Sequence, residues 1–249
     1  MKHESLIVID KWVDIGKLGF PIPISDTQAL RTKENEAEHR HLTFLILPIL
    51  TLEENRILII NKAEKNKRKD PEHADAYPSL CLDIAIGGHG VLELVPEHER
   101  TSGILSMESA VAQAYRELNE ELALVENKAL PFEAQDLTLL GLCSYPVKEP
   151  SPQKTVSNRE LSVLFGLEVR QLSSDFEVQD SVIENGEEVQ IKLPCFGYRY
   201  DELLSLWENR ELHTGEYRIE DGLSRLLETG HLPQMVSEKM NGRSILSCL

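Results

Sequence analysis

Three glutamates near the middle of the chain have the spacing that brings side chains together on a helix. Glu117, Glu120 and Glu121 occupy positions i, i+3 and i+4, so a helix would carry all three carboxylates along one flank. Like charges at these spacings repel one another by roughly 0.2–0.5 kcal/mol per pair. A divalent cation reverses that balance, and magnesium prefers carboxylate oxygens while keeping water ligands that a phosphate oxygen can replace. The spacing therefore indicates a magnesium site for a small phosphorylated molecule.

The residues around these glutamates extend the pattern. Glu108 is followed by seven residues, then by Arg-Glu-Leu-Asn-Glu-Glu at 116–121 and Leu-Ala-Leu at 122–124. This pattern resembles the Nudix hydrolase signature, Gly-x5-Glu-x7-Arg-Glu-U-x-Glu-Glu-x-Gly-U, in which U is a bulky aliphatic residue. The glutamates and the arginine match at fixed spacing, and Leu118 and Leu124 stand at the two U positions. A Glu-rich helix alone is often only a solvated face, whereas fixed spacing favours a functional site.

The resemblance implies a magnesium-dependent hydrolase, with manganese as the alternative metal. Such an enzyme would cleave a phosphoanhydride bond in a nucleoside diphosphate derivative or a related small molecule. One glutamate would activate the attacking water, and Arg116 would orient Glu108 or Glu117 through a salt bridge. The implied metal ligands are Gly88 through its carbonyl group, Glu117, Glu120 and Glu121, and the implied catalytic residues are Glu108, Arg116, Glu117 and Glu120.

The segment upstream of the helix also resembles this superfamily, with two departures. Tyr77 to Asp83 runs into Gly87-Gly88-His89, similar to the Gly-Gly-His turn of the isopentenyl diphosphate isomerase-like branch. The spacing from Gly88 to Glu108 is about fourteen residues longer than in the signature. Gly103 lies one position from the place of the first signature glycine, and Ala123 replaces the last one. Neither departure removes a carboxylate.

Two other functions compete with hydrolysis. An isomerase of this superfamily would carry a reactive cysteine where Gly87 stands, and Cys81 does not align with that place. A catalytically silent ligand sensor typically loses the signature carboxylates, whereas all of them are present here. Magnesium-dependent product release from a panel of diphosphates would separate the enzyme from the sensor. Screening that panel would also identify the substrate, which the motifs do not specify.

Other polar segments offer weaker candidates. The basic stretch from Lys62 to His73 reads as a solvated loop that could reach over the site to meet phosphates. Glu184, Glu187 and Glu188 are candidates for a base on the Asn185-Gly186 hairpin. We interpret His39 and His41 as structural and treat His89, beside the Gly-Gly pair, as a candidate contact to metal or phosphate.

Composition limits the partners of this chain. The formal net charge of −16 argues against binding a nucleic-acid polymer or an anionic membrane surface. The four cysteines are far apart and form no Cys-x-x-Cys pair, so we expect reduced thiols and a cytoplasmic location. No apolar run is long enough for a transmembrane helix or a signal peptide. A homodimer remains an open arrangement.

Apolar periodicity predicts an α/β (α+β) fold, and the resemblance implies a Nudix-type α/β/α sandwich with a mixed sheet. We divide the chain into an N-terminal strand and arm at 1–40 and a hydrolase domain at 41–249. Val91 to Ser106 reads as an irregular exposed insertion, and Met107 to Leu124 as a helix. The expected strands are 41–50, 56–61, 77–88, 137–144 and 161–169, with a hairpin at 182–191 and terminal helices at 201–210 and 219–228.

Overall fold

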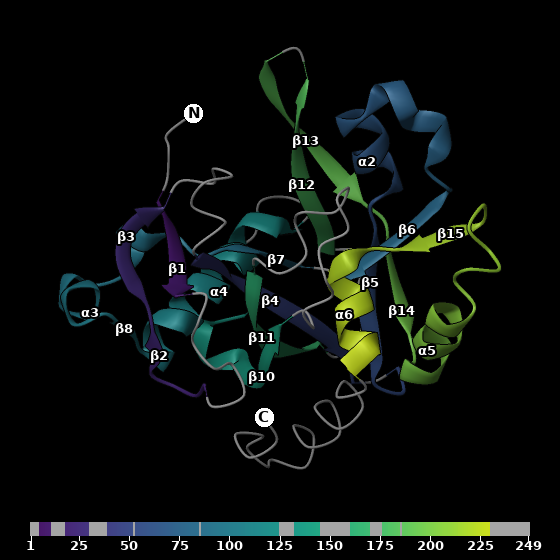
Figure 1. Ribbon diagram of the computed structural model, residues 1–249. Coiled ribbons are helices and arrows are strands. Elements are labelled where there is room, and N and C mark those ends of the chain that lie inside the picture. The colour runs from purple at the N-terminus through teal and green to yellow at the C-terminus, as the bar shows by residue number, and fades with distance from the viewer. Residues whose placement is uncertain are drawn as a thin grey trace.

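The computed structural model describes residues 5–10, 18–29, 39–51, 53–84, 86–124, 132–144, 160–169, 176–184 and 186–229. Within these residues the chain forms a ten-stranded mixed sheet with helices on both faces, together with a three-stranded and a two-stranded sheet (Figure 1). Parallel and antiparallel pairs both occur in the large sheet. The predicted α+β class with a mixed sheet is therefore confirmed.

The large sheet is built around β4 (His39–Leu50). This strand pairs in parallel with β11 along its length and antiparallel with β1, β7 and β5 at successive positions. Pro48 lies between the residues paired with β7 and those paired with β5, and the strand continues through it. The other strands of the sheet are β1 (Leu6–Asp10), β3 (Ser25–Ala29), β5 (Arg56–Asn61), β6 (Leu80–Ile84), β7 (Ile86–His89), β10 (Leu137–Ser144), β11 (Glu160–Val169), β14 (Cys195–Tyr198) and β15 (Tyr217–Ile219).

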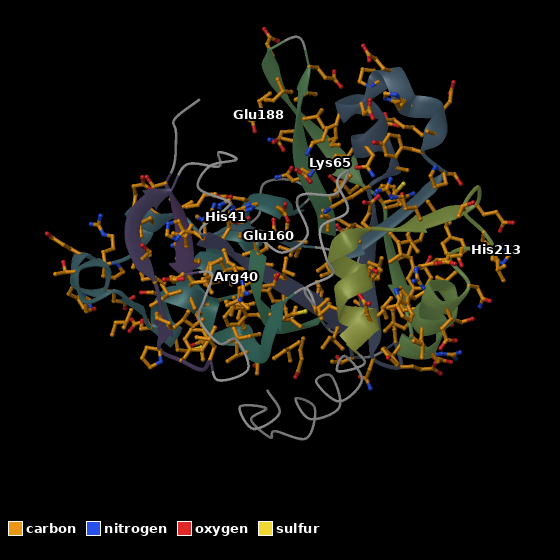
Figure 2. The ribbon with its side chains drawn as sticks, viewed as in Figure 1. Arg40, His41, Lys65, Glu160, Glu188 and His213 are labelled. Carbon is orange, nitrogen blue, oxygen red and sulfur yellow. The ribbon has the colours of Figure 1, made fainter. Side chains whose placement is uncertain are left out.

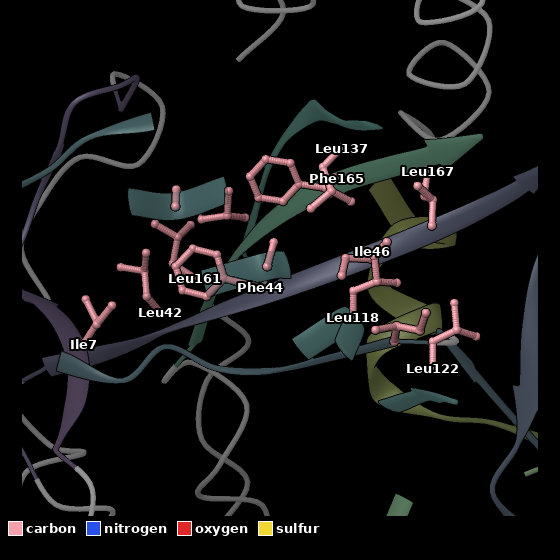
Figure 3. Close-up of a cluster of buried hydrophobic side chains, with 14 of the residues drawn as sticks. Ile7, Leu42, Phe44, Ile46, Leu118, Leu122, Leu137, Leu161, Phe165 and Leu167 are labelled. Carbon is pink, nitrogen blue, oxygen red and sulfur yellow. The ribbon is translucent and has the colours of Figure 1, made fainter. Parts of the chain in front are cut away.

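Alternating side chains of β4 face two separate cores, which explains its nearly continuous apolar sequence. Phe44 and Ile46 join a large cluster with Phe165 and Leu118, shown in Figure 3. Leu47 points to the opposite face, into a second cluster. Full burial of each such side chain contributes about 1.5–3 kcal/mol.

Helix α4 (Met107–Glu121) covers the first face. Ser106 caps its N-terminus, where the Ser106 side chain accepts a hydrogen bond of 3.1 Å from the Ser109 backbone N–H. Ala110, Ala114 and Leu118 recur every four residues and are fully buried. The helix ends before Leu122, earlier than predicted, because 122–124 forms strand β9.

The two predicted terminal helices are present as α5 (Tyr200–Glu208) and α6 (Asp221–Thr229), and they cover the second face. Their buried leucines pack against Leu47 and Leu164 of the sheet. With α4 on one side and α5 and α6 on the other, the described residues form an α/β/α arrangement. None of the described helices is long and apolar enough to cross a membrane.

The segment expected to be an exposed insertion is folded and packed, so that expectation was wrong. It contains a 3-10 turn at Leu92–Leu94, helix α3 (Glu97–Ser102) and strand β8 (Ile104–Leu105). Strand β8 pairs with β2 (Ile22–Pro23), and Leu105 is fully buried. Residues 22–23 and 25–29, expected to belong to the N-terminal arm, form strands β2 and β3, while 30–38 lie outside the described residues.

Two further expectations need correction. The basic stretch after β5 is not a loop, because it forms helix α2 (Ala63–Lys69) and a 3-10 helix at Pro71–Ala76. The single strand expected at 77–88 is two strands, and β6 pairs with β5 while β7 pairs with β4.

A separate sheet carries the predicted hairpin. Strands β12 (Phe176–Glu184) and β13 (Glu187–Leu193) pair from Val178↔Leu193 to Glu184↔Glu187, which confirms the hairpin. Strand β12 also pairs with β9 (Leu122–Leu124), directly after α4. The hairpin therefore lies against the end of the acidic helix and projects away from the large sheet (Figure 1).

Candidate metal and active site

One row of α4 side chains contacts β7 and the residues that directly follow this strand. Gln113 makes hydrogen bonds of 3.1 and 3.0 Å with the N–H and carbonyl groups of Val91. One turn later Glu117 lies against Gly88, and one turn further Glu121 accepts a 2.8 Å hydrogen bond from the Gly87 N–H. The spacing of four residues thus brings two of the three carboxylates predicted to bind metal to the Gly-Gly pair.

Both glycines are required by close packing. A Cβ atom at Gly88 would lie 2.3 Å from Oε2 of Glu117, inside the carboxylate. A Cβ atom at Gly87 would lie 2.7 Å from the Phe44 carbonyl oxygen and 2.5 Å from a methyl group of Leu45. A side chain at Gly87 would force the backbone of β4 to move, whereas one at Gly88 would displace the Glu117 carboxylate. The Gly-Gly pair therefore allows the Glu117 carboxylate to approach the strand backbone.

Arg116 donates hydrogen bonds to two carboxylates of the site and to β7. Its Nη1 donates to both carboxylate oxygens of Glu120 at 2.9 and 2.8 Å. Its Nη2 donates to the His89 carbonyl oxygen at 2.8 Å and also to Glu117. The predicted ion pair between Arg116 and Glu117 is thus present, and the same guanidinium group holds Glu120 and β7.

The charges of this cluster are poorly compensated. Burial raises the pKa of Glu117 to about 7, against the opposing effect of Arg116 and with the added repulsion of Glu121 and Glu120. Burial also raises the pKa of Glu121, opposed by the Gly87 N–H and by Lys62 and Lys65. Two carboxylates with raised pKa values on one helix flank form an environment that an added cation would stabilise.

Glu108 lies apart from this cluster. It is exposed in the first turn of α4, eight residues before Arg116 and therefore about 12 Å away along the helix axis. The suggested salt bridge from Arg116 to Glu108 is wrong, because Arg116 reaches Glu117 and Glu120 instead. A carboxylate at this end of the helix is favoured by the macrodipole.

Two lysines approach the cluster from α2 and were not assigned individually from the sequence. Lys62 pairs with Asp83 at 2.8 Å, and Lys65 pairs with Asp180 of β12. Both lysines interact electrostatically with Glu121. Local sequence did not reveal these pairs because Asp180 follows Lys65 by 115 residues and only the fold brings them together.

The remaining candidates are distributed around the site. Glu184 pairs with Arg68 of α2 at 3.1 Å, whereas Glu187 and Glu188 are exposed on the hairpin. His89 Nε2 lies 3.5 Å from Glu160 Oε1, and its ring meets that of His41 edge-on with centroids 5.8 Å apart. His41 is buried, in keeping with a structural role.

The donor types suit magnesium, but the side chains are not gathered around one point. Among the described residues, no three His, Cys, Asp or Glu side chains are placed so that they could hold an ion as they stand. Glu120 is the most exposed member, with 54% of its side chain accessible, and turning it away from Arg116 would bring a third carboxylate to the flank. Because Gly88 has no side chain, the Glu117 carboxylate can lie against β7, and this position agrees with metal ligands on the same side of the helix.

Comparisons with known proteins give matches among solved structures. No protein-family profile and no curated protein matches the chain. A protein from Deinococcus radiodurans is 16% identical with a TM-score of 0.40, covering 91% of this chain and 98% of that one. A bifunctional NMN adenylyltransferase/ADP ribose pyrophosphatase from Francisella tularensis is 14% identical with a TM-score of 0.34, covering 79% of this chain and 42% of that one.

A third match is a MutT/nudix family protein from Enterococcus faecalis, 12% identical with a TM-score of 0.29, covering 84% of this chain and 77% of that one. Nudix hydrolases are thus among the structures that this chain matches. These identities and TM-scores are low, so we base the function proposed below on the residues of this chain.

Proposed function

We propose that this protein is a Nudix-type hydrolase that uses magnesium to cleave a phosphoanhydride bond in a small diphosphate. The observation that carries the proposal is the buried Glu117 carboxylate, held against Gly88 with a pKa raised to about 7 and with Glu121 one turn away. Arg116 pairs with Glu117 and the Gly87 N–H donates to Glu121, yet burial still raises the pKa of both carboxylates, so their charges are only partly compensated. A site that keeps them is suited to bind a cation.

The residues of the cluster take distinct roles in this proposal. Glu117, Glu120 and Glu121, with the Gly88 carbonyl group, would hold magnesium or, alternatively, manganese. When bound, the metal supplies charge neutralisation for the phosphoryl oxygens and makes a coordinated water more acidic. Arg116 keeps Glu117 and Glu120 oriented by donating to both of them and to β7. Glu120, the most exposed of the three, is the carboxylate best placed to accept a proton from the attacking water.

The structure disfavours the isomerase alternative. Gly87 stands where that reaction would need a cysteine, and its Cβ position is occupied by Leu45 and the Phe44 carbonyl oxygen. A side chain with a reactive thiol would not fit there without moving β4. A silent sensor remains the second candidate, and it differs from the enzyme in binding diphosphates without turnover.

Activity assays on a diphosphate panel test the proposal. Magnesium should raise the melting temperature and support product release by the native protein. Glu120→Gln should lower turnover by at least about 100-fold, since even partners outside the metal's own ligands cost 10–100-fold when removed. Glu97→Gln, an exposed glutamate on α3, is the matched control and should retain activity. An active Glu120→Gln variant would contradict the assignment.

Isotope labelling identifies the bond that is cut. Hydrolysis in water-18O should place the heavy oxygen in one phosphate product, because water attacks phosphorus. The native protein should also exchange no deuterium from solvent into isopentenyl diphosphate. Deuterium incorporation together with no phosphate product from any diphosphate in the panel would restore the isomerase.

A further inference from the structure

Helix α2 carries a row of lysines on one face. Lys62 at its N-cap, Lys65 and Lys69 are spaced i, i+3 and i+7, so their side chains leave the helix in nearly the same direction. Like charges at these spacings repel, and the chain as a whole is strongly acidic. A positive row in such a protein marks a local preference for anions.

The lysine row faces the end of the acidic helix. Lys65 and Lys62 both interact electrostatically with Glu121, the last residue of α4. Strand β12 connects the two helices, because its Gln179 side chain reaches the Glu120 carbonyl oxygen at 3.5 Å and its Asp180 pairs with Lys65. Figure 2 shows Lys65 of α2 beside the β12–β13 hairpin.

Asp180 occupies an unusual position for a carboxylate. It lies between Val178 and Val182, which are both buried on the inward face of β12, and its own side chain is only 14% exposed. Strand β12 pairs with β9 at Val178↔Leu122, so Asp180 extends past that pair toward the end of α4. A buried ion pair is weak evidence for stability, because desolvation offsets its attraction.

The two lysines near Glu121 differ in how firmly they are held. Asp83 pairs with Lys62 and also accepts hydrogen bonds from the Ile84 and Leu223 N–H groups, so that pair is tied into the fold. Burial, together with the neighbouring Lys62 and Lys69, lowers the pKa of Lys65 to about 7, and its partner Asp180 accepts one backbone hydrogen bond, from the adjacent Ser181 N–H. The Lys65 cation would therefore gain from a second anion, whereas Lys62 is already compensated.

Building on the function proposed above, we propose that Lys65 binds the substrate's second phosphoryl group, the one that the α4 carboxylates and their metal leave free. In the absence of substrate, Asp180 pairs with the Lys65 ammonium group at the edge of the site. When the diphosphate binds, this ammonium group leaves Asp180 and binds the phosphoryl group. The class of ligand is a magnesium-bound diphosphate that extends from the end of α4 toward α2. Lys65 is thereby a substrate-binding residue on an element that carries no part of the glutamate motif.

The test measures binding of methylenediphosphonate, a diphosphate that is not hydrolysed, by calorimetry with magnesium present. Lys65→Gln should weaken this binding roughly tenfold to a hundredfold, as expected for the loss of one charge-assisted hydrogen bond. Lys67→Gln is the matched control, because it removes the same charge from the opposite side of α2 and should leave the affinity unchanged. Asp180→Asn should tighten binding severalfold by removing the competing carboxylate.

The opposite signs of the Lys65 and Asp180 effects separate ligand binding from a structural role. If the pair only fastened α2 to the hairpin, both variants would weaken binding alike, which would overturn the inference. The double variant Lys65→Gln/Asp180→Asn leaves neither charge of this pair without its partner, so it should stay folded. It should bind methylenediphosphonate more weakly than the native protein does. Equal affinity of the double variant and the native protein would also overturn it.

Different results would refute the role of Lys65 and the proposed function of the protein. Magnesium alone should raise the melting temperature of the Lys65→Gln/Asp180→Asn variant as much as that of the native protein, because the metal ligands are untouched. A native protein that neither gains stability from magnesium nor hydrolyses any diphosphate would refute the proposed function. Native hydrolysis combined with unaltered methylenediphosphonate binding by Lys65→Gln would refute the role of Lys65 alone.

Discussion

Replacing Glu117 with glutamine should stabilise the metal-free protein at neutral pH. The side chain is 7% exposed, and its pKa is raised from 4.5 to about 7. At 1.36 kcal/mol per pKa unit, the ionised carboxylate lowers the unfolding free energy by about 3 kcal/mol relative to its neutral form. Glutamine has nearly the same shape as the neutral acid and does not ionise. The variant should therefore gain about 3 kcal/mol where the native carboxylate is charged.

The pH dependence follows from the direction of this shift. Below pH 4.5 both the folded and unfolded proteins hold the Glu117 proton, so the variant and the native protein should be equally stable. Between pH 4.5 and about 7 the folded state holds a proton that the unfolded state has lost, so native stability falls as pH rises. Above about 7 the difference should remain constant.

Urea unfolding in EDTA at pH 5 and pH 8 measures this difference directly. Glu108→Gln, in the exposed first turn of the same helix, is the control and should not reproduce the gain of about 3 kcal/mol at pH 8. Magnesium should stabilise the native protein at pH 8 and have little effect on Glu117→Gln. A variant that is less stable than the native protein at pH 8 in EDTA would refute the argument, since the carboxylate would then be satisfied by the fold.

Three other substitutions test single contacts. Gly88→Ala should weaken magnesium binding more than it lowers the melting temperature, because its Cβ atom would displace the Glu117 carboxylate; unchanged magnesium affinity would contradict this. Leu105→Ala should cost about 2–5 kcal/mol in urea unfolding, since the side chain is fully buried in the core, and a cost below 1 kcal/mol would mean that the segment 92–105 is peripheral. Asp83→Ala should destabilise by about 3–5 kcal/mol because it strands the Lys62 cation and two N–H groups, and Lys62→Met should rescue part of that loss.

Local signals in the sequence predicted the elements that depend on local interactions. The apolar spacing of Val111, Tyr115, Leu118 and Leu122 indicated α4, and Asn185-Gly186 indicated the hairpin, because helix and turn propensities act over a few residues. The close packing of the glycines with Glu117 was not visible in advance, although the glycines themselves were recognised. Their role depends on how far α4 lies from β7, which is set by tertiary packing.

Two of the wrong expectations concern charged segments that read as solvated loops. The segment 92–105 is rich in charge and contains Pro96, so it reads as a loop, yet Leu92, Val95 and Leu105 are buried and β8 pairs with β2. The basic stretch of α2 was expected to be solvated because charge patterns do not report partners that are distant in sequence. Asp180 and Glu184 provide those partners from a hairpin more than a hundred residues later.

The parallel pairing of β4 and β11 sets an order of events during synthesis. His41 pairs with Glu160, 119 residues later, so β4 has no partner on that edge until most of the chain has been made. At about 5–20 residues per second, the ribosome takes roughly 6–24 s to produce the missing strand. Over that time a long apolar strand edge is open to pairing with other chains. Nascent chains stalled before Glu160 should therefore be the form of this protein that depends most on chaperones.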